Sequence, residues 1–180
     1  MSVSDGMLKN RKSNAPKNAD IQIRPAEPED ADAVREIELL TSASPWSRDS
    51  LAKDIAEHDR ALVLVAVDVN AHCDDEFRSD KDGGRIIGYA DAWLVVGEAQ
   101  LNNIAIVADY RGIGAGEMLL RRLMEMAAET CDSMNLELRI SNKVAANLYK
   151  KMDFRQDGIR PGYYEDNNET AVLMSTELRA

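Results

Sequence analysis

The spacing of apolar and polar residues predicts three short elements in the first part of the chain. Residues 21–24 alternate in polarity, as a half-buried strand does. A helix then opens at Pro28, because proline is favoured in the first helical turn. Its expected apolar face consists of Ala33, Val34, Ile37 and Leu40. A second helix is expected over 48–57, with Leu51 and Ile55 facing inward.

Three strands are predicted in the middle of the chain. Residues 62–69 are rich in β-branched side chains, and strands at 85–96 and 100–107 follow. The polar stretch 70–84 ends in two glycines, which is typical of a long hairpin loop. It contains the run His72-Cys73-Asp74-Asp75, but neighbouring ligands in a loop rarely converge on one ion, so we expect no metal site there.

The last third of the chain predicts two more helices and three strands. The first helix covers 114–130, and the residues expected on its buried side are Met118, Leu119, Leu123, Met126 and Ala127. The remaining segments are a strand at 136–140, a helix at 142–152 and a hairpin of 154–160 with 169–178. Ser141 or Asn142 is a natural cap for that second helix. The order βααβββαβαββ predicts an α/β fold with a mixed central sheet flanked by helices.

Length and composition fit one domain. A chain of 180 residues suits a single core, which we expect to span residues 21–180. Residues 1–20 contain mainly polar and basic side chains with almost nothing to bury, so we expect a disordered tail there. No apolar run approaches the ~18 to 20 residues of a membrane span, and the N-terminus lacks the apolar core of a secretory signal.

Charge and cysteine content narrow the function classes. The net charge of −10 argues against nucleic-acid binding, which needs clustered Lys and Arg. It is compatible with a basic peptide or an amine as substrate, because negative potential attracts cations, although composition alone favours plain solubility as the explanation. Cys73 and Cys131 lie in unrelated contexts and form no metal or redox motif. We therefore expect a cytoplasmic protein with free thiols and no membrane partner.

The most specific sequence feature is the glycine-rich connection Arg111-Gly112-Ile113-Gly114-Ala115-Gly116, which joins a predicted strand to a predicted helix. Glycines let the backbone approach an anion closely, and a helix N-terminus directs N–H groups and partial positive charge at it. We therefore expect a phosphate or pyrophosphate ligand. A nucleotide P-loop would need Gly-Lys-Ser/Thr, and the glycine spacing does not fit a dinucleotide fingerprint. The alternative is a turn that only joins two elements.

A second segment, 136–154, reads LELRISNKVAANLYKKMDF. Together the two segments resemble the GNAT superfamily of acyl-CoA-dependent N-acetyltransferases. The superfamily pattern Arg/Gln-x-x-Gly-x-Gly/Ala falls on Arg111, Gly114 and Gly116. The second segment, with Pro45-Trp46-Ser47 and Arg160-Pro161-Gly162-Tyr163-Tyr164, is similar to the RimI-type ribosomal-protein-alanine N-acetyltransferases. The likeness spans about residues 21–178 and implies a GNAT-type acyl-CoA N-acyltransferase fold.

The resemblance implies that acetyl-CoA is the co-substrate and that no metal takes part. Backbone amides of residues 111–116, the phosphate loop, would bind the pyrophosphate. Strand residues Ile104, Ala105 and Ile106 would pair with the pantetheine arm, and the N–H of Ile106 would meet the thioester oxygen. Asn142, at a helix start, would contact the cofactor as well as cap the helix.

The resemblance also implies which residues transfer protons. Glu137 falls on the general-base position of the RimI-type enzymes, and Tyr149 on the position of a tyrosine that protonates the departing thiolate. From the residues alone other interpretations stand. Glu137 and Arg139 point away from the apolar face of their strand, which also suits a solvated face or a Glu–Arg pair. A tyrosine at helical spacing is usually a core residue.

Exposed aromatic residues are implied on the acceptor side. Trp46, between the first two helices, and Tyr163 and Tyr164, in the last hairpin, would receive an N-terminal peptide, although Trp46 also suits packing on the core. The implied function is transfer of acetyl to the N-terminal alanine of a small-subunit ribosomal protein. The alternatives are a small-molecule amine or a lysine side chain as acceptor, or an acyl-CoA-binding module without catalysis.

Three positions depart from the family pattern. Glu117 places an acid where basic or small polar residues are common, so we expect it to weaken cofactor binding while favouring the helix dipole. Gly112 adds a glycine to the phosphate loop. Met152-Asp153-Phe154 replaces the usual Leu-Gly-Phe at a turn.

Overall fold

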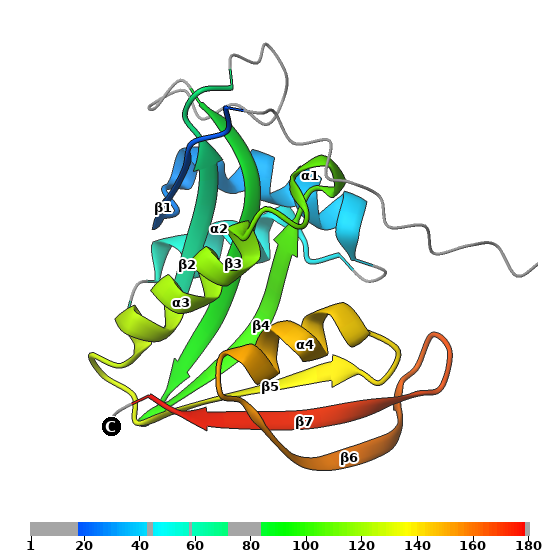
Figure 1. The fold of residues 1–180 in the computed structure, drawn as a ribbon. Coiled ribbons are helices and arrows are strands. Elements are labelled where there is room, and N and C mark those ends of the chain that lie inside the picture. The colour runs from blue at the N-terminus through cyan, green and yellow to red at the C-terminus, as the bar shows by residue number, and fades with distance from the viewer. Residues whose placement is uncertain (1–17, 43–44, 58, 72–83, 179–180) are drawn as a thin grey trace, which may run out of the picture.

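One sheet organises the chain (Figure 1). The computed structural model describes residues 18–42, 45–57, 59–71 and 84–178. Residues 1–17 of the expected tail and the run His72-Cys73-Asp74-Asp75 lie outside the described residues. The seven strands join in the order β1-β2-β3-β4-β5-β7-β6.

The order of the elements confirms the predicted βααβββαβαββ, with two short 3-10 helices in addition. The strands are β1 (Ile21–Pro25), β2 (Ala61–Asp68), β3 (Arg85–Val95), β4 (Glu98–Ile106), β5 (Ser133–Arg139), β6 (Arg155–Tyr164) and β7 (Glu169–Glu177). The α-helices are α1 (Ala31–Thr41), α2 (Arg48–Ala56), α3 (Ala115–Ala127) and α4 (Lys143–Lys151). The 3-10 helices are η1 (Pro28–Asp30), before α1, and η2 (Ala108–Tyr110), before α3.

The sheet separates at its centre. Every neighbouring pair of strands is antiparallel except β4 and β5, which run parallel. β4 and β5 pair only from Glu98 with Ser133 to Leu101 with Leu136, and beyond that point they diverge (Figure 1). A bulge in β4 lies at the same level, because Asp91 of β3 faces Asn103 while Ala92 faces Leu101. The divergence opens the sheet between the second halves of β4 and β5.

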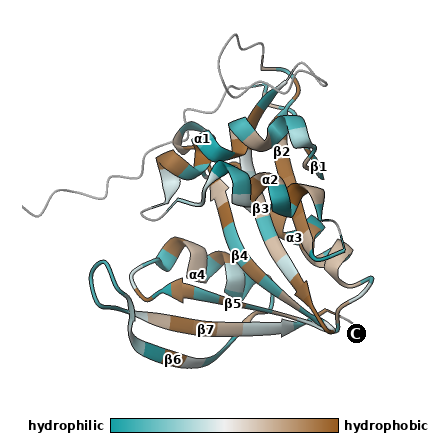
Figure 2. Cartoon of the chain, turned by 180° about the vertical axis from the view of Figure 1, so that it is seen from behind, coloured by the Kyte–Doolittle hydropathy of each residue, from teal (hydrophilic) through white to brown (hydrophobic). Residues whose placement is uncertain are grey.

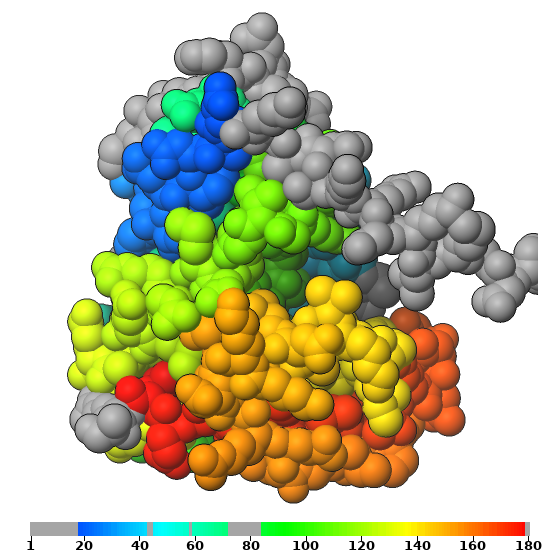
Figure 3. Space-filling view, viewed as in Figure 1, coloured from blue at the N-terminus to red at the C-terminus, as the bar shows by residue number. Residues whose placement is uncertain are grey.

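The helices form two layers. α1 packs on β3 and β4 and α2 on β2, while α3 packs on β1 to β4. Figures 1 and 2, seen from opposite sides, place α1 and α2 on one face of the sheet and α3 on the other. α3 and α4 meet in the space-filling view (Figure 3), and a Cβ added to Gly116 would lie 3.7 Å from Leu148 of α4 and 3.8 Å from Ile106. The N-terminus of α3 therefore lies beside both α4 and the end of β4.

The buried faces of the helices and strands follow the predicted periodicity except at Leu40, Met118 and Ile140. Leu40 and Met118 are 67% and 41% exposed, so their assignment to the core was wrong. In α3 the buried stripe consists of Ala115, Leu119, Leu120, Leu123 and Ala127. It includes Ala115 and Leu120, which were not predicted to be on this face. Ile140 is 45% exposed because β5 ends at Arg139, one residue before it.

The described chain is already attached to the sheet at residue 18, inside the expected tail. The side chain of Asn70 donates to the Asn18 carbonyl oxygen at 2.9 Å, and the N–H of Val69 donates to the Asp20 carbonyl oxygen at 3.0 Å. The N–H of Asp20 donates in turn to the buried carboxylate of Asp68. Among the described helices, none is long and apolar enough to cross a membrane.

Candidate active site

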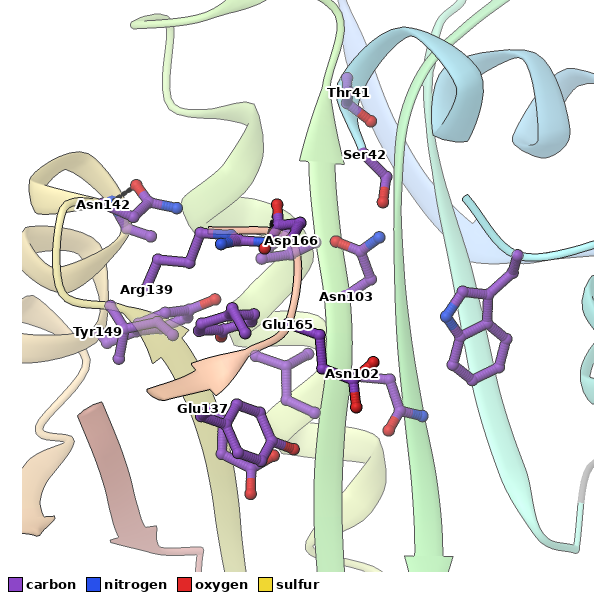
Figure 4. Close-up of a pocket in the computed structure, with 17 residues that line it drawn as sticks. Thr41, Ser42, Asn102, Asn103, Glu137, Arg139, Asn142, Tyr149, Glu165 and Asp166 are labelled. Carbon is purple, nitrogen blue, oxygen red and sulfur yellow. Dashed lines mark hydrogen bonds and ion pairs between the residues drawn. The ribbon is translucent and has the colours of Figure 1, made fainter. Parts of the chain in front are cut away.

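A cleft of about 830 Å³ opens where β4 and β5 separate. Its walls come from the end of α1, the middle of β4, the end of β5, α4 and the connection between β6 and β7 (Figure 4). Seven of the predicted site residues line it: Trp46, Ile104, Glu137, Asn142, Tyr149, Tyr163 and Tyr164. Ala105, Ile106 and the phosphate loop lie outside this lining, toward α3.

The phosphate loop has an open geometry that its glycines explain. Gly112 and Gly114 have φ angles of 82° and 95°, in the left-handed region that favours glycine. A Cβ added at either position would meet no protein atom within 4 Å. Gly114 is the N-cap of α3 and has no side chain to accept from the first-turn N–H groups. The loop therefore presents backbone amides and the helix dipole to open space, which is the arrangement that binds phosphate.

Glu117 is balanced by two cations. Lys151 of α4 donates to its carboxylate at 2.5 Å, and Arg121 donates to it at 3.2 Å. The hydrogen bond from Lys151 is the main reason that the pKa of Glu117 lies below its ordinary value; desolvation opposes this lowering, and the hydrogen bond from Arg121 adds to it. The negative charge of Glu117 is thus paired with two cations, and its effect on cofactor binding stays a prediction.

The second half of β4 directs backbone groups into the gap left by β5. The N–H of Val107 donates to the Ile87 carbonyl oxygen at 2.9 Å, so residue 107 faces β3. Because backbone groups alternate between the two edges of a strand, those of Ile106 and Ile104 face the opposite edge. Arg111 Nε donates to the Ile106 carbonyl oxygen on that edge at 2.8 Å, tying the phosphate loop to the strand. The Ile106 N–H thus points to the edge of β4 that faces the gap.

Glu137 projects from the polar face of β5. Leu136 and Leu138 on either side are 3% and 5% exposed, while the Glu137 side chain is 27% exposed and lines the cleft. Its carboxylate accepts from Arg160 of β6 at 2.9 Å. A pair between Glu137 and Arg139 does not form, since Arg139 bonds Asp166 and Glu169 instead. The Arg160 partner lies 23 residues away, and no local pattern could have revealed it.

Tyr149 is both a core residue and a cleft residue. It is 6% exposed, and its ring packs against Phe154 with centroids 5.6 Å apart. It also extends from α4 into the cleft (Figure 4). Burial, assisted by Tyr164, raises the pKa of its hydroxyl well above the ordinary value. The hydroxyl therefore keeps its proton at physiological pH, as an acid must.

Both ends of α4 lie at residues that the sequence analysis singled out. Asn142 is the N-cap, and its side-chain oxygen accepts from the Ala145 N–H at 3.1 Å, which confirms the predicted cap. Asp153, just after α4, has a φ of 64°, in the region that glycine favours. The turn at Met152-Asp153-Phe154 thus uses a glycine-like backbone conformation without the glycine.

The three aromatic residues predicted to receive the acceptor all line the cleft. Trp46 is partly buried on the core and lies 5.4 Å from Trp93 between ring centroids, so it packs and also lines the cleft. Tyr163 and Tyr164 belong to β6, which runs four residues beyond the predicted end at Arg160 across an irregular register. Arg139 lies over the Tyr164 ring at 3.9 Å from its centroid.

Sequence reasoning missed the polar residues on the α1 side of the cleft. Asn102 and Asn103 line it, and their amides contact the buried acids Asp91 and Glu38. Asp91 carried a usable signal, because an aspartate between alanines in an apolar strand is unusual. Glu38 carried none, since charged residues are ordinary in a surface helix. Within the described ranges, no three His, Cys, Asp or Glu side chains are arranged to hold a metal ion.

Sequence comparison identifies relatives over most of the chain. Residues 31–154 match the acetyltransferase (GNAT) family. A Bacillus subtilis (strain 168) protein, provisionally named as a ribosomal protein bS18-alanine N-acetyltransferase, is 40% identical over 147 residues. The match covers 81% of this chain and 88% of that protein.

Solved structures agree with this family. The ribosomal-protein-S18-alanine N-acetyltransferase from Escherichia coli superposes with a TM-score of 0.72 at 28% identity, covering 89% of this chain and 95% of that one. Arabidopsis thaliana NAA60 in complex with acetyl-CoA shares the fold, with a TM-score of 0.76 at 17% identity over 88% of this chain and 98% of that one. The chain belongs to the acetyltransferase (GNAT) family.

Proposed function

We propose that this acetyltransferase transfers the acetyl group of acetyl-CoA to a protein N-terminus, with the N-terminal alanine of a small-subunit ribosomal protein as acceptor. The observation that carries the proposal is that Glu137 and Tyr149, from different elements, line one cleft beside the phosphate loop. The relatives named as bS18-alanine N-acetyltransferases support this choice of acceptor. With that acceptor, the reaction would take place in the cytoplasm.

Two surfaces of the chain suit acetyl-CoA. The open phosphate loop and the first turn of α3 suit the pyrophosphate, because their N–H groups face outward. The edge of β4 from Ile104 to Ile106 suits the amides of the pantetheine arm, which would pair with it as an added strand does. Bound there, acetyl-CoA supplies an activated acetyl carbon, and the Ile106 N–H would stabilise negative charge on the acetyl oxygen.

The residues of the chain supply two proton transfers. Glu137 takes a proton from the acceptor ammonium, directly or through water, so that the neutral nitrogen can bond to the acetyl carbon. As the carbon–sulfur bond breaks, the Tyr149 hydroxyl gives its proton to the sulfur. The nitrogen, once bonded to the acetyl carbon, loses a second proton as the amide forms. Of the two protons that leave the nitrogen, one returns to Tyr149 through solvent and the other is released to solvent, which restores both residues.

Arg160 positions the Glu137 carboxylate for this role. Their contact of 2.9 Å joins side chains that are 55% and 27% exposed. An exposed ion pair of this kind is worth only about 0.2 to 1 kcal/mol, so an incoming ammonium can replace Arg160 at little cost. Glu137 therefore has a preformed position without being locked away from the acceptor.

The proposal is tested by thiol release from acetyl-CoA across a panel of acceptors. The panel consists of peptides that differ only at residue one, an N-terminally blocked peptide with an internal lysine, and spermidine. We expect the peptide with a free N-terminal alanine to react fastest. Preferred turnover of spermidine or of the blocked lysine peptide would assign the enzyme to another acceptor. Binding of coenzyme A with no turnover of any acceptor would indicate a non-catalytic module.

A further inference from the structure

A buried polar cluster lies behind the bulge of β4, on the α1 side of the cleft. Glu38, Tyr89 and Asp91 are 1%, 0% and 2% exposed. These three residues bond the side-chain amides of Asn102 and Asn103, which line the cleft (Figure 4). The proton transfers assigned to Glu137 and Tyr149 use none of these residues.

The side-chain amide of Asn103 is held in one orientation. Its nitrogen donates to Glu38 Oε1 at 3.0 Å and to the Tyr89 hydroxyl at 2.7 Å, which uses both of its protons. A carboxylate only accepts hydrogen bonds, so the nitrogen of the amide must face Glu38. The oxygen then points the other way. Figure 4 shows the oxygen on the β5 side of Asn103 and the nitrogen on the α1 side.

Negative charge lies directly behind this amide. Glu38 Oε2 and Asp91 Oδ1 are buried without a hydrogen-bond partner in the part of the chain that the structure describes. The charged groups that act on Asp91 are themselves acids, Asp54 and Glu38. Burial, followed by repulsion from Asp54, raises the pKa of Asp91 to about 7; the hydrogen bond from Asn102 opposes this rise, and Glu38 adds a smaller repulsion. Buried carboxylates without a cation are costly, and a positive group in the cleft would offset that cost.

We propose that the Asn103 side-chain oxygen binds the α-amino group of the acceptor, and that Glu38 is the positioning residue that keeps this oxygen facing the cleft. The proposal rests on the proposed function and adds a substrate-binding residue to it. Glu38 polarises the amide, because a hydrogen bond to a charged acceptor strengthens the one made at the other end. The acceptor amine would then lie between Asn103 on β4 and Glu137 on β5, which receives its proton.

The alternative is that the cluster only stabilises the bulge. Both roles allow the stability to change when the cluster is altered, so stability does not separate them. They differ in what they predict for ligands. A structural role affects peptides with and without an α-amino group alike, whereas the proposed role affects only the binding that depends on the amine.

The experiment measures binding of two peptides to the coenzyme A complex by calorimetry. One begins with alanine, and its partner begins with a propionyl group, which lacks only the α-amino nitrogen. The variants are Glu38→Gln and Asn103→Ala. Glutamine keeps the size of the side chain but can present either an oxygen or an NH₂ group, so Asn103 is free to flip. Glu165→Gln is the matched control, because it removes a negative charge from the exposed rim of the same cleft without touching Asn103.

We expect the wild type and Glu165→Gln to prefer the alanine peptide by about tenfold, the value of one hydrogen bond to a charged group. Glu38→Gln and Asn103→Ala should lose most of this preference while binding coenzyme A as before. Equal weakening of both peptides, or retention of the preference in either variant, would overturn the proposal. Failure of the wild type to bind the alanine peptide would instead refute the proposed function, so the two failures are distinguishable.

Discussion

The surfaces proposed for the two ligands, the cofactor wall and the acceptor wall, are built in different ways. The cofactor wall is made of main chain: the phosphate loop, the first turn of α3 and the free edge of β4. The acceptor wall is made of side chains that come from separate segments, as in the contacts of Glu137 with Arg160 and of Asn103 with Glu38. The first wall therefore depends on backbone conformation, and the second depends on long-range packing.

This difference suits the two ligands. The backbone of a GNAT domain can be kept while its side chains change. A binding surface made of main chain therefore suits acetyl-CoA, the co-substrate that all these acetylations share. A wall of side chains can be altered one residue at a time, so it suits an acceptor that differs between enzymes. Substitutions should accordingly separate into those that affect cofactor affinity and those that affect the acceptor or the proton transfers.

The largest expected effect is on the acceptor wall. Glu137→Gln should lower turnover by roughly 10²- to 10⁴-fold at neutral pH, the usual range for a lost general base. The affinity for acetyl-CoA should stay unchanged. Glu165→Gln, which alters another carboxylate of the same cleft, is the control and should change turnover only slightly. Near-normal turnover of Glu137→Gln would remove the residue from the mechanism.

Tyr149→Phe should lower turnover by roughly 10²-fold, because the ring and its contact with Phe154 remain while the proton donor is lost. Stability should fall by no more than about 0.5 to 1.5 kcal/mol, the contribution of an ordinary hydrogen bond. An acetyl donor with a more acidic leaving thiol should restore part of the rate. A variant that melts earlier but turns over normally would assign Tyr149 to packing alone.

On the cofactor wall, Gly114→Val should reduce affinity for coenzyme A by about a hundredfold, as expected for the loss of one or two hydrogen bonds to phosphate. Valine is strained at the φ of 95°, but no protein atom lies within 4 Å of the added Cβ, so the strain should stay within the loop and the fold should persist. Gly97→Val is the matched control, since Gly97 also has a positive φ, of 83°, but lies in the β3–β4 turn. Equal affinities of the two folded variants, measured by calorimetry, would contradict the phosphate-loop assignment.

The last expected effect is on stability rather than on activity or affinity, and it concerns Asp91. Its raised pKa means that the native state binds more protons than the unfolded state between about pH 4 and 7, so stability falls as the pH rises through that range. The full cost at pH 8 is at most about 4 kcal/mol. Asp91→Asn should therefore raise the Tm by roughly 5 to 10 °C at pH 8 and by much less at pH 4.

Asp157→Asn, at an exposed position of β6, is the control for this measurement. Its effect on the Tm should be small and similar at the two pH values. If Asp91→Asn gave the same shift at pH 4 as at pH 8, the buried carboxylate would not be the source of the pH dependence.

The cofactor wall was largely predictable from the sequence because its signals are local. The phosphate loop is one continuous run of residues, and Asn142 caps the helix that it begins. The order of the elements follows from periodicity for the same reason. Errors such as Leu40 and Met118 arose where periodicity left the edge of the buried face undefined.

The acceptor wall was only partly predictable because its contacts join distant segments. Glu38 and Asn103 are 65 residues apart, and the β4 bulge that brings Asn102 and Asn103 to the cleft arises from pairing with β3. Glu137 was predicted through the family resemblance, but its partner Arg160 was not. The polar face of β5 suggested a pair with Arg139, and only the tertiary structure shows that Arg139 bonds Asp166 and Glu169.

The pH dependence of single-turnover acetylation, compared between the wild type and Glu137→Gln, tests the division between the two walls most directly. The wild type can use the ammonium form of the acceptor, whereas the variant must wait for the neutral amine, whose fraction rises about tenfold per pH unit below about pH 8. We expect the rate of the wild type divided by the rate of Glu137→Gln to fall about tenfold for each pH unit between about pH 6 and 8. A ratio that stays constant over this range would show that Glu137 does not receive the proton.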